Sequence, residues 1–128
     1  MKLIDDIKKI KEKYHDYSVL YVEDEEKVRI QTLYFLTKFF SNIDTAMDGQ
    51  DGLSMFDKNS YDIVISDLQM PKLDGKEMLK KIREKNDKVT LIALSAYDSS
   101  ADVSGITCDY YLSKPVVIED FIKVFNAL

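Results

Sequence analysis

Five polar residues stand at the ends of short apolar runs, and their side chains could together build one site. Glu23 and Asp24 follow the first such run, Asp67 follows another, Ser95 closes a third, and Lys114 follows the last. If these runs are parallel strands of one sheet, three carboxylates, a hydroxyl and an ammonium meet at its carboxyl-terminal edge. Open α/β sheets bind their ligands at that edge.

The three carboxylates are suited to a divalent cation. Glu23, Asp24 and Asp67 offer hard oxygen ligands, which Mg²⁺ prefers and Mn²⁺ also accepts. Each acid alone would more often be a solvated helix cap, since Asp and Glu fill 23 of the 128 positions. Their shared position at strand ends favours a magnesium site.

The surrounding pattern predicts an α/β fold. From Ser18 onward, short β-rich apolar runs alternate with segments of helical period, which is typical of βαβ units around a parallel sheet. The predicted strands are residues 19–22, 43–46, 63–66, 90–94 and 110–112. The first, third and fourth are continuously apolar, so we expect them in the middle of the sheet, covered on both faces.

The predicted helices between and after these strands each present an apolar face. Two Asp-Gly pairs mark helix starts, where Asp51 or Asp74 could cap the helix. The inward residues are expected to be Val28, Leu33, Leu36 and Phe40, then Leu53 and Phe56, then Met78, Leu79 and Ile82, and finally, within 117–128, Phe121, Ile122, Val124, Phe125 and Leu128.

Two segments depart from the regular alternation. Residues 1–16 carry an apolar stripe at helical spacing and predict an amphipathic leader helix ahead of a main domain at 17–128. The sequence leaves open whether this helix packs on its own domain or serves a partner. Residues 97–107 predict at most a short helix, because Asp, Ser and Gly dominate there.

Composition excludes several functions. The net charge is −5 and the basic residues form no block, which argues against nucleic-acid binding. Acidic residues near the start argue against a signal peptide, and no apolar run is long enough to span a membrane. The one cysteine, Cys108, cannot form an internal disulfide, which favours the cytoplasm.

The order and spacing of these segments resemble the response-regulator receiver domains of two-component phosphorelays. The resemblance covers Ser18 to the end of the chain and is carried by residues 22–25, 67–75, 94–96 and 110–115. It implies a flavodoxin-like, doubly wound (βα)5 fold with strand order 2-1-3-4-5, here preceded by the extra leader helix.

The resemblance also implies a chemistry. Asp67 would be the phosphoacceptor, attacking a phosphohistidine as a carboxylate nucleophile. Mg²⁺ would be held by Glu23, Asp24, Asp67 and the backbone carbonyl of Gln69, and Lys114 would pair with the phosphoryl oxygens. The chain would thus catalyse its own phosphoryl transfer and dephosphorylation without being a conventional enzyme.

A conformational switch is implied as well. The Ser95 hydroxyl would bind the phosphoryl group, and its movement would let Tyr111 turn inward and remodel a partner-binding face. The backbone N–H groups of Leu68 and Ala96 would be further phosphoryl donors. Pro115 would follow a cis peptide bond and aim the preceding lysine into the site.

The resemblance implies a sensor histidine kinase or a phosphotransfer protein as partner, and leaves the output partner or effector domain, a homodimer, and a stand-alone or fragment state open. The main alternative is a pseudo-receiver that acts as a phosphorylation-independent interaction module. An aspartyl phosphatase is disfavoured because Gln69 stands where such enzymes usually carry a second acid. A flavin protein lacks its phosphate loop here, and His15, the single histidine, is expected at the surface rather than as a phosphotransfer residue.

Overall fold

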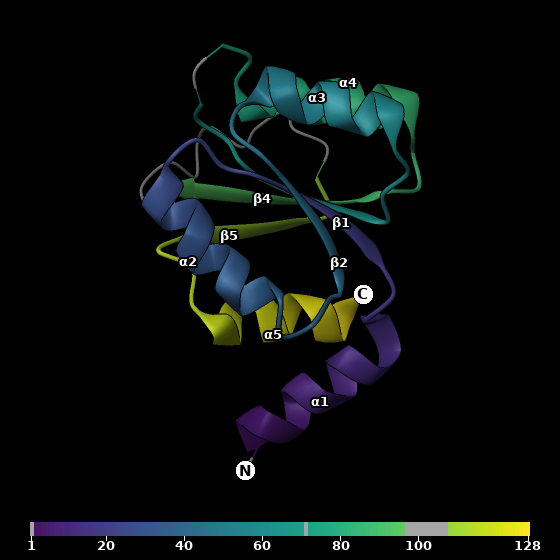
Figure 1. Ribbon diagram of the computed structural model, residues 1–128, viewed down its shortest axis with the longest axis vertical. Helices are drawn as coiled ribbons and strands as arrows, with labels where there is room; N and C mark the ends of the chain where they lie inside the picture. The colour runs from purple at the N-terminus through teal and green to yellow at the C-terminus, as the bar shows by residue number, and fades with distance from the viewer. Residues whose placement is uncertain (1, 71, 97–107) are drawn as a thin grey trace.

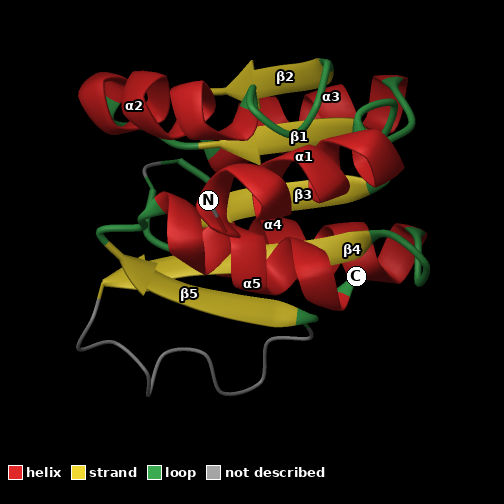
Figure 2. Ribbon diagram, turned by 90° about the horizontal axis from the view of Figure 1, so that it is seen from below, coloured by secondary structure: helices red, strands yellow, loops and turns green. Residues whose placement is uncertain are grey.

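In the computed structural model, five parallel strands form one sheet in the order β2-β1-β3-β4-β5, as the sequence analysis predicted (Figure 2). The structure describes residues 2–70, 72–96 and 108–128, so the predicted short helix within 97–107 lies outside the described residues. The strands are β1 (Ser18–Val22), β2 (Asn42–Ala46), β3 (Ile63–Asp67), β4 (Thr90–Ala96) and β5 (Tyr110–Lys114). The described helices are α1 (Lys2–Tyr14), α2 (Glu26–Leu36), α3 (Gly49–Lys58), α4 (Gly75–Lys85) and α5 (Ile118–Ala127).

Helices cover both faces of the sheet, and each face has its own apolar core. Figure 1 shows α3 and α4 on one side, with α2, α5 and α1 on the other. Alternate residues of β1 enter alternate cores: Val19 and Tyr21 pack with α2 and α5, whereas Leu20 and Val22 pack with α3 and α4. No helix in the described ranges is long and apolar enough to cross a membrane.

The strands extend further than their apolar runs. β3 ends at Asp67, β4 continues through Ser95, and β5 ends at Lys114. The polar residues keep the extended backbone because they still pair across the sheet, with Ser95 opposite Ser113 and Lys114 opposite Ala96. Three of the expected site residues therefore sit on strands rather than on loops, where neighbouring strands hold their backbone.

The helix starts correct one prediction. Asp48, not Asp51, caps α3, because the Asp48 carboxylate accepts a hydrogen bond from the Asp51 N–H at 2.7 Å. The reason is that α3 begins at Gly49, so Asp51 already lies inside its first turn. Asp74 caps α4 as expected, accepting from the N–H of Glu77 at 2.9 Å.

The leader helix α1 packs on its own domain through its second half. Ile10 and Tyr14 are 2% and 5% exposed and join the core that contains Phe125 of α5. The Tyr14 hydroxyl donates a hydrogen bond to the carbonyl of Leu128 at 3.2 Å. By contrast Ile4, near the start of the helix, is 61% exposed, so the apolar stripe is buried at one end only.

We therefore expect α1 to contribute to stability through Ile10. Ile10→Ala should lower the free energy of unfolding by about 2 to 5 kcal/mol, because it removes a buried side chain from a packed core. Ile4→Ala, in the same helix, should change it by no more than about 0.5 kcal/mol. Urea denaturation of both variants checks this, and equal effects would mean that α1 does not share the core.

Candidate functional site at the carboxyl edge of the sheet

One ammonium joins two buried carboxylates at the carboxyl-terminal edge of the sheet. Lys114 Nζ lies 2.8 Å from Glu23 Oε1 and 2.9 Å from Asp67 Oδ2. These residues come from β5, from the end of β1 and from β3. The Glu23 side chain is 1% exposed and that of Asp67 is 10% exposed, so both ion pairs are largely shielded from water.

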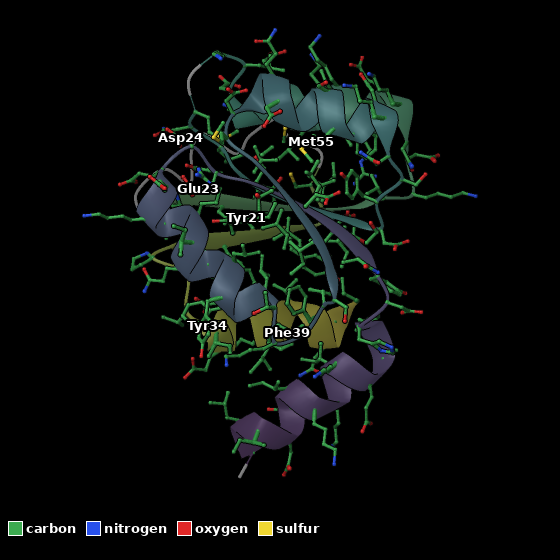
Figure 3. All side chains as sticks on the ribbon, in the orientation of Figure 1. Tyr21, Glu23, Asp24, Tyr34, Phe39 and Met55 are labelled. Atoms are coloured by element: carbon green, nitrogen blue, oxygen red, sulfur yellow. The ribbon has the colours of Figure 1, made fainter. Side chains whose placement is uncertain are left out.

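Asp24 completes an acidic cluster with the same two carboxylates. One oxygen each from Glu23, Asp24 and Asp67 lies within 4.8 Å of the others. Figure 3 shows Glu23 and Asp24 together near the beginning of α2. Asp24 is exposed while its neighbours are buried, so a cation here would have protein oxygens on one side and water on the other. The set therefore fits a hard divalent cation that keeps part of its hydration shell.

The charges of the cluster are unbalanced. Burial raises the pKa of Glu23, and the nearby charge of Asp67 raises it further, while Lys114 and the Glu25 N–H oppose the shift. Burial lowers the pKa of Lys114, but its hydrogen bonds and charge interactions with Glu23 and Asp67 outweigh burial and raise it. Lys114 thus remains an ammonium that contacts two carboxylates, and Asp24 adds a third to the same cluster, so a bound divalent cation would relieve the excess negative charge.

Several residues that hold Glu23 in place were missed at the sequence level. Arg29 of α2 donates from Nη1 to the Glu23 carbonyl at 2.9 Å, and the Glu25 N–H donates to Glu23 Oε2 at 3.2 Å. The Glu23 N–H in turn donates to the carbonyl of Ala46 on β2 at 3.1 Å. The position of Arg29, one turn into the helix after β1, carries no pattern that distinguishes it from a solvated arginine.

A buried tyrosine, Tyr21, lies on β1 two residues before Glu23. Tyr21 is 0% exposed, and apart from the nearby Thr32 side chain its hydroxyl has no hydrogen-bond partner among the described residues. Burial raises its pKa, the charges of Glu23 and Asp67 add to the shift, and the nearby Thr32 side chain opposes it. In the sequence, Tyr21 stands within the apolar run 19–22, which gave no reason to expect a buried polar group there.

The backbone after Asp67 corrects one expected role. The Leu68 N–H donates to the Leu94 carbonyl at 3.0 Å, so it is engaged with β4 and not free to bind a phosphoryl group. The next N–H, of Gln69, faces the acceptor instead and lies 3.3 Å from Asp67 Oδ1. The error arose because the pairing of Leu68 depends on a strand that is distant in the sequence.

The other expected site residues lie around this centre. Ser95 is 9% exposed on β4, the strand between β3 and β5. The Lys114–Pro115 peptide bond is cis. Tyr111 is 41% exposed on the edge strand β5, whereas Tyr110 packs against the core and donates to the Ala127 carbonyl at 3.1 Å.

Lys114 also borders a groove of about 360 Å³ beside the ion pairs. The groove runs between α2 and the segment after β5, and its walls are mainly apolar. Its lining residues are Glu25, Val28, Gln31, Thr32, Phe35, Leu94, Lys114, Pro115 and Val116. The site can therefore be approached along the α2 side of the sheet edge.

Comparison with known proteins agrees with this geometry. The family model described as the response regulator receiver domain matches residues 19–126. The chain is similar to the response regulator ArlR of Staphylococcus aureus, with 34% identity over 112 residues, which cover 86% of this chain and 51% of that protein. It spans about half the length, or less, of the curated relatives it matches.

Solved structures give the same result. The response regulator TrrA of Thermotoga maritima, determined in complex with Mg²⁺–BeF, is 28% identical, with a TM-score of 0.77 over 88% of this chain and 98% of that chain. The receiver domain of Ssk1 of Saccharomyces cerevisiae, co-crystallised with the histidine phosphotransfer protein Ypd1, is 26% identical, with a TM-score of 0.77 over 87% of each chain.

The acidic cluster predicts that Mg²⁺ stabilises the fold. A ligand that binds only the native state at one hundred times its Kd adds about 2.7 kcal/mol to the free energy of unfolding, so Tm should rise with Mg²⁺. Asp24→Asn should abolish most of this rise, while Glu84→Gln, an exposed acid near the end of α4, should leave it intact. Thermal unfolding across a Mg²⁺ titration measures the rise in Tm. An equal rise in Tm in both variants would contradict a site at Asp24.

Proposed function

Because the chain belongs to the response regulator receiver domain family, we propose that it is a signalling switch that accepts a phosphoryl group on Asp67. Phosphorylation would change the surface that a partner binds. The observation that carries this proposal is the position of Asp67, whose carboxylate contacts Lys114 at 2.9 Å and also belongs to the acidic cluster.

The proposed reaction is a direct transfer to a carboxylate. An oxygen of Asp67 attacks the phosphorus of a phosphohistidine, and the new O–P bond forms as the P–N bond breaks. The imidazole leaves with the electron pair and takes up a proton from solvent. Water then hydrolyses the acyl phosphate, which releases inorganic phosphate, returns the Asp67 carboxylate and ends the signal.

The residues around Asp67 have distinct parts in this proposal. Lys114 starts on the Asp67 carboxylate and moves to the phosphoryl oxygens, where an ammonium forms strong charge-assisted hydrogen bonds. The N–H of Gln69, which already faces the carboxylate, and that of Ala96 are the proposed backbone donors, and Ser95 supplies a hydroxyl. Gln69 would also offer its carbonyl to the metal. Mg²⁺ bound by the acidic cluster would neutralise charge between the nucleophile and the phosphoryl group.

The proposed switch links this site to the edge of the sheet. Ser95 and Tyr111 belong to neighbouring strands, β4 and β5, and Tyr111 is partly exposed in this structure. If Ser95 moves toward a phosphoryl group, the Tyr111 ring can turn inward and change the face that β5 presents. Such a change would shift the populations of two states that a partner binds unequally.

The proposed phosphodonor is a sensor histidine kinase or a histidine phosphotransfer protein. The complex of the Ssk1 receiver domain with Ypd1 supports a partner of this kind.

The function is tested by phosphorylation with acetyl phosphate, followed by intact-mass analysis. We expect one Mg²⁺-dependent phosphoryl adduct in the wild type and none in Asp67→Asn, which keeps the shape of the side chain but removes the nucleophile. Lys114→Ala should slow the reaction by about 10²-fold or more, because it removes a positioned cation from the reacting oxygens.

Glu84→Gln should react like the wild type and serves as the control. A wild type that gains no adduct although Mg²⁺ raises its Tm would favour a phosphorylation-independent interaction module. An adduct that persists in Asp67→Asn would place the acceptor elsewhere.

A further inference from the structure

The first residue of α4 lies directly against the backbone of the proposed phosphoacceptor. A Cβ atom on Gly75 would be 1.9 Å from the carbonyl oxygen of Asp67 and 2.7 Å from the Cα of Leu68. These are backbone atoms, so a side chain at this position could be accommodated only by moving the chain that carries Asp67. The Gly75 N–H also donates to the Leu68 carbonyl at 2.9 Å, which ties the start of the helix to the residue after Asp67.

A second glycine, Gly49, lies equally close to backbone, in this case that of the segment between β3 and α4. A Cβ atom on Gly49, the first residue of α3, would be 1.8 Å from the carbonyl oxygen of Leu73, in the segment that links β3 to α4. The preceding residue, Asp48, lies 3.5 Å from the ammonium of Lys72 in that segment. The start of α3 therefore rests on the segment between Asp67 and Gly75, and the start of α4 rests on Asp67 itself.

Hydrogen bonds also fix the segment between β3 and α4 where it leaves β3, at Leu68. The Leu68 N–H is bonded to β4, while the Leu68 carbonyl accepts from Gly75, so both backbone groups of the residue after Asp67 are paired. A displacement of α4 would thus be passed to Asp67 and to the Gln69 N–H that faces it. Reactions at a positioned group are sensitive to such shifts, since a misplacement of about 1 Å can cost about 10²-fold in rate.

We propose that Gly75, supported by Gly49, is a positioning residue that sets where the Asp67 carboxylate stands relative to Lys114 and the acidic cluster. The proposal rests on the proposed function for its kinetic consequence, but the geometry it describes also governs cation binding. The competing explanation is that Gly75 only allows α4 to pack against β3 and contributes stability alone.

Gly52 provides a matched control for this distinction. It is a buried glycine of α3, and a Cβ there would be 2.7 Å from the sulfur of Met78 and 2.9 Å from a methyl group of Val22. Gly52→Ala therefore crowds side chains in the core on the α3 side rather than the backbone of Asp67. It should lower stability without moving the acceptor.

The experiment compares the full chain with Gly75→Ala, Gly49→Ala and Gly52→Ala at a temperature where circular dichroism shows each to be folded. The acetyl phosphate reaction is followed by intact mass, and the Mg²⁺ affinity by the rise in Tm. For Gly75→Ala we expect about a 10²-fold slower reaction and weaker Mg²⁺ binding; for Gly49→Ala, a smaller loss of both; and for Gly52→Ala, wild-type rate and affinity.

Wild-type rate and Mg²⁺ affinity in Gly75→Ala, or equal losses in Gly75→Ala and Gly52→Ala, would overturn the proposal. If Gly75→Ala does not fold, Gly49→Ala decides, and unchanged rate and affinity there would count against it. If the wild type itself forms no adduct, the proposed function fails, while the Mg²⁺ affinities of the glycine variants still decide whether Gly75 positions Asp67.

Discussion

The structure depends on how three carboxylates are brought together beside one ammonium. One carboxylate oxygen each from Glu23, Asp24 and Asp67 lies within 4.8 Å of the others, an arrangement that mutual repulsion opposes. Lys114 offsets part of that repulsion by reaching from the edge strand β5, past the end of β4, to β3 and β1. One ammonium cannot balance three carboxylates, so the cluster keeps an excess negative charge that favours binding of a cation. In the proposed function, the ammonium of Lys114 would also bind a phosphoryl group on Asp67.

The repulsion within this cluster is opposed by the buried central strands, which fix the backbone at or next to the acidic residues. β1, β3 and β4 are buried between two apolar cores; Asp67 and Ser95 lie on two of these strands, and Glu23 follows β1 directly. Close contact between the start of α4 and the backbone of Asp67 adds a steric limit to the hydrogen bonds of the sheet. The two buried acids, Glu23 and Asp67, therefore cannot move apart without disturbing the core, whereas Asp24 is exposed.

The pairing of β4 with β5 suggests how a charge change at Asp67 could reach the surface. Lys114 and Tyr111 belong to one short strand at the edge of the sheet, and Ser95 lies on the strand beside it. In the proposed switch, a phosphoryl group on Asp67 would bind both Lys114 and Ser95 and would therefore act on both strands at once. The extra helix α1 packs against α5 instead, so it enlarges the core on the α2 and α5 face without contacting the acidic cluster.

The sequence by itself determined the alternation of strands and helices, the central position of β1, β3 and β4, and the meeting of Asp67 and Lys114 at one sheet edge. These follow from hydrophobic periodicity and from the parallel direction of βαβ units, which are local properties of the chain. Tertiary structure decided the pairing of Leu68 with Leu94, the contact of Arg29 with Glu23, the approach of Gly75 to Asp67 and the docking of α1 through Ile10 and Tyr14. Each of these depends on which backbone or side-chain groups from distant segments are placed within a few ångströms of each other, and no local pattern records that distance.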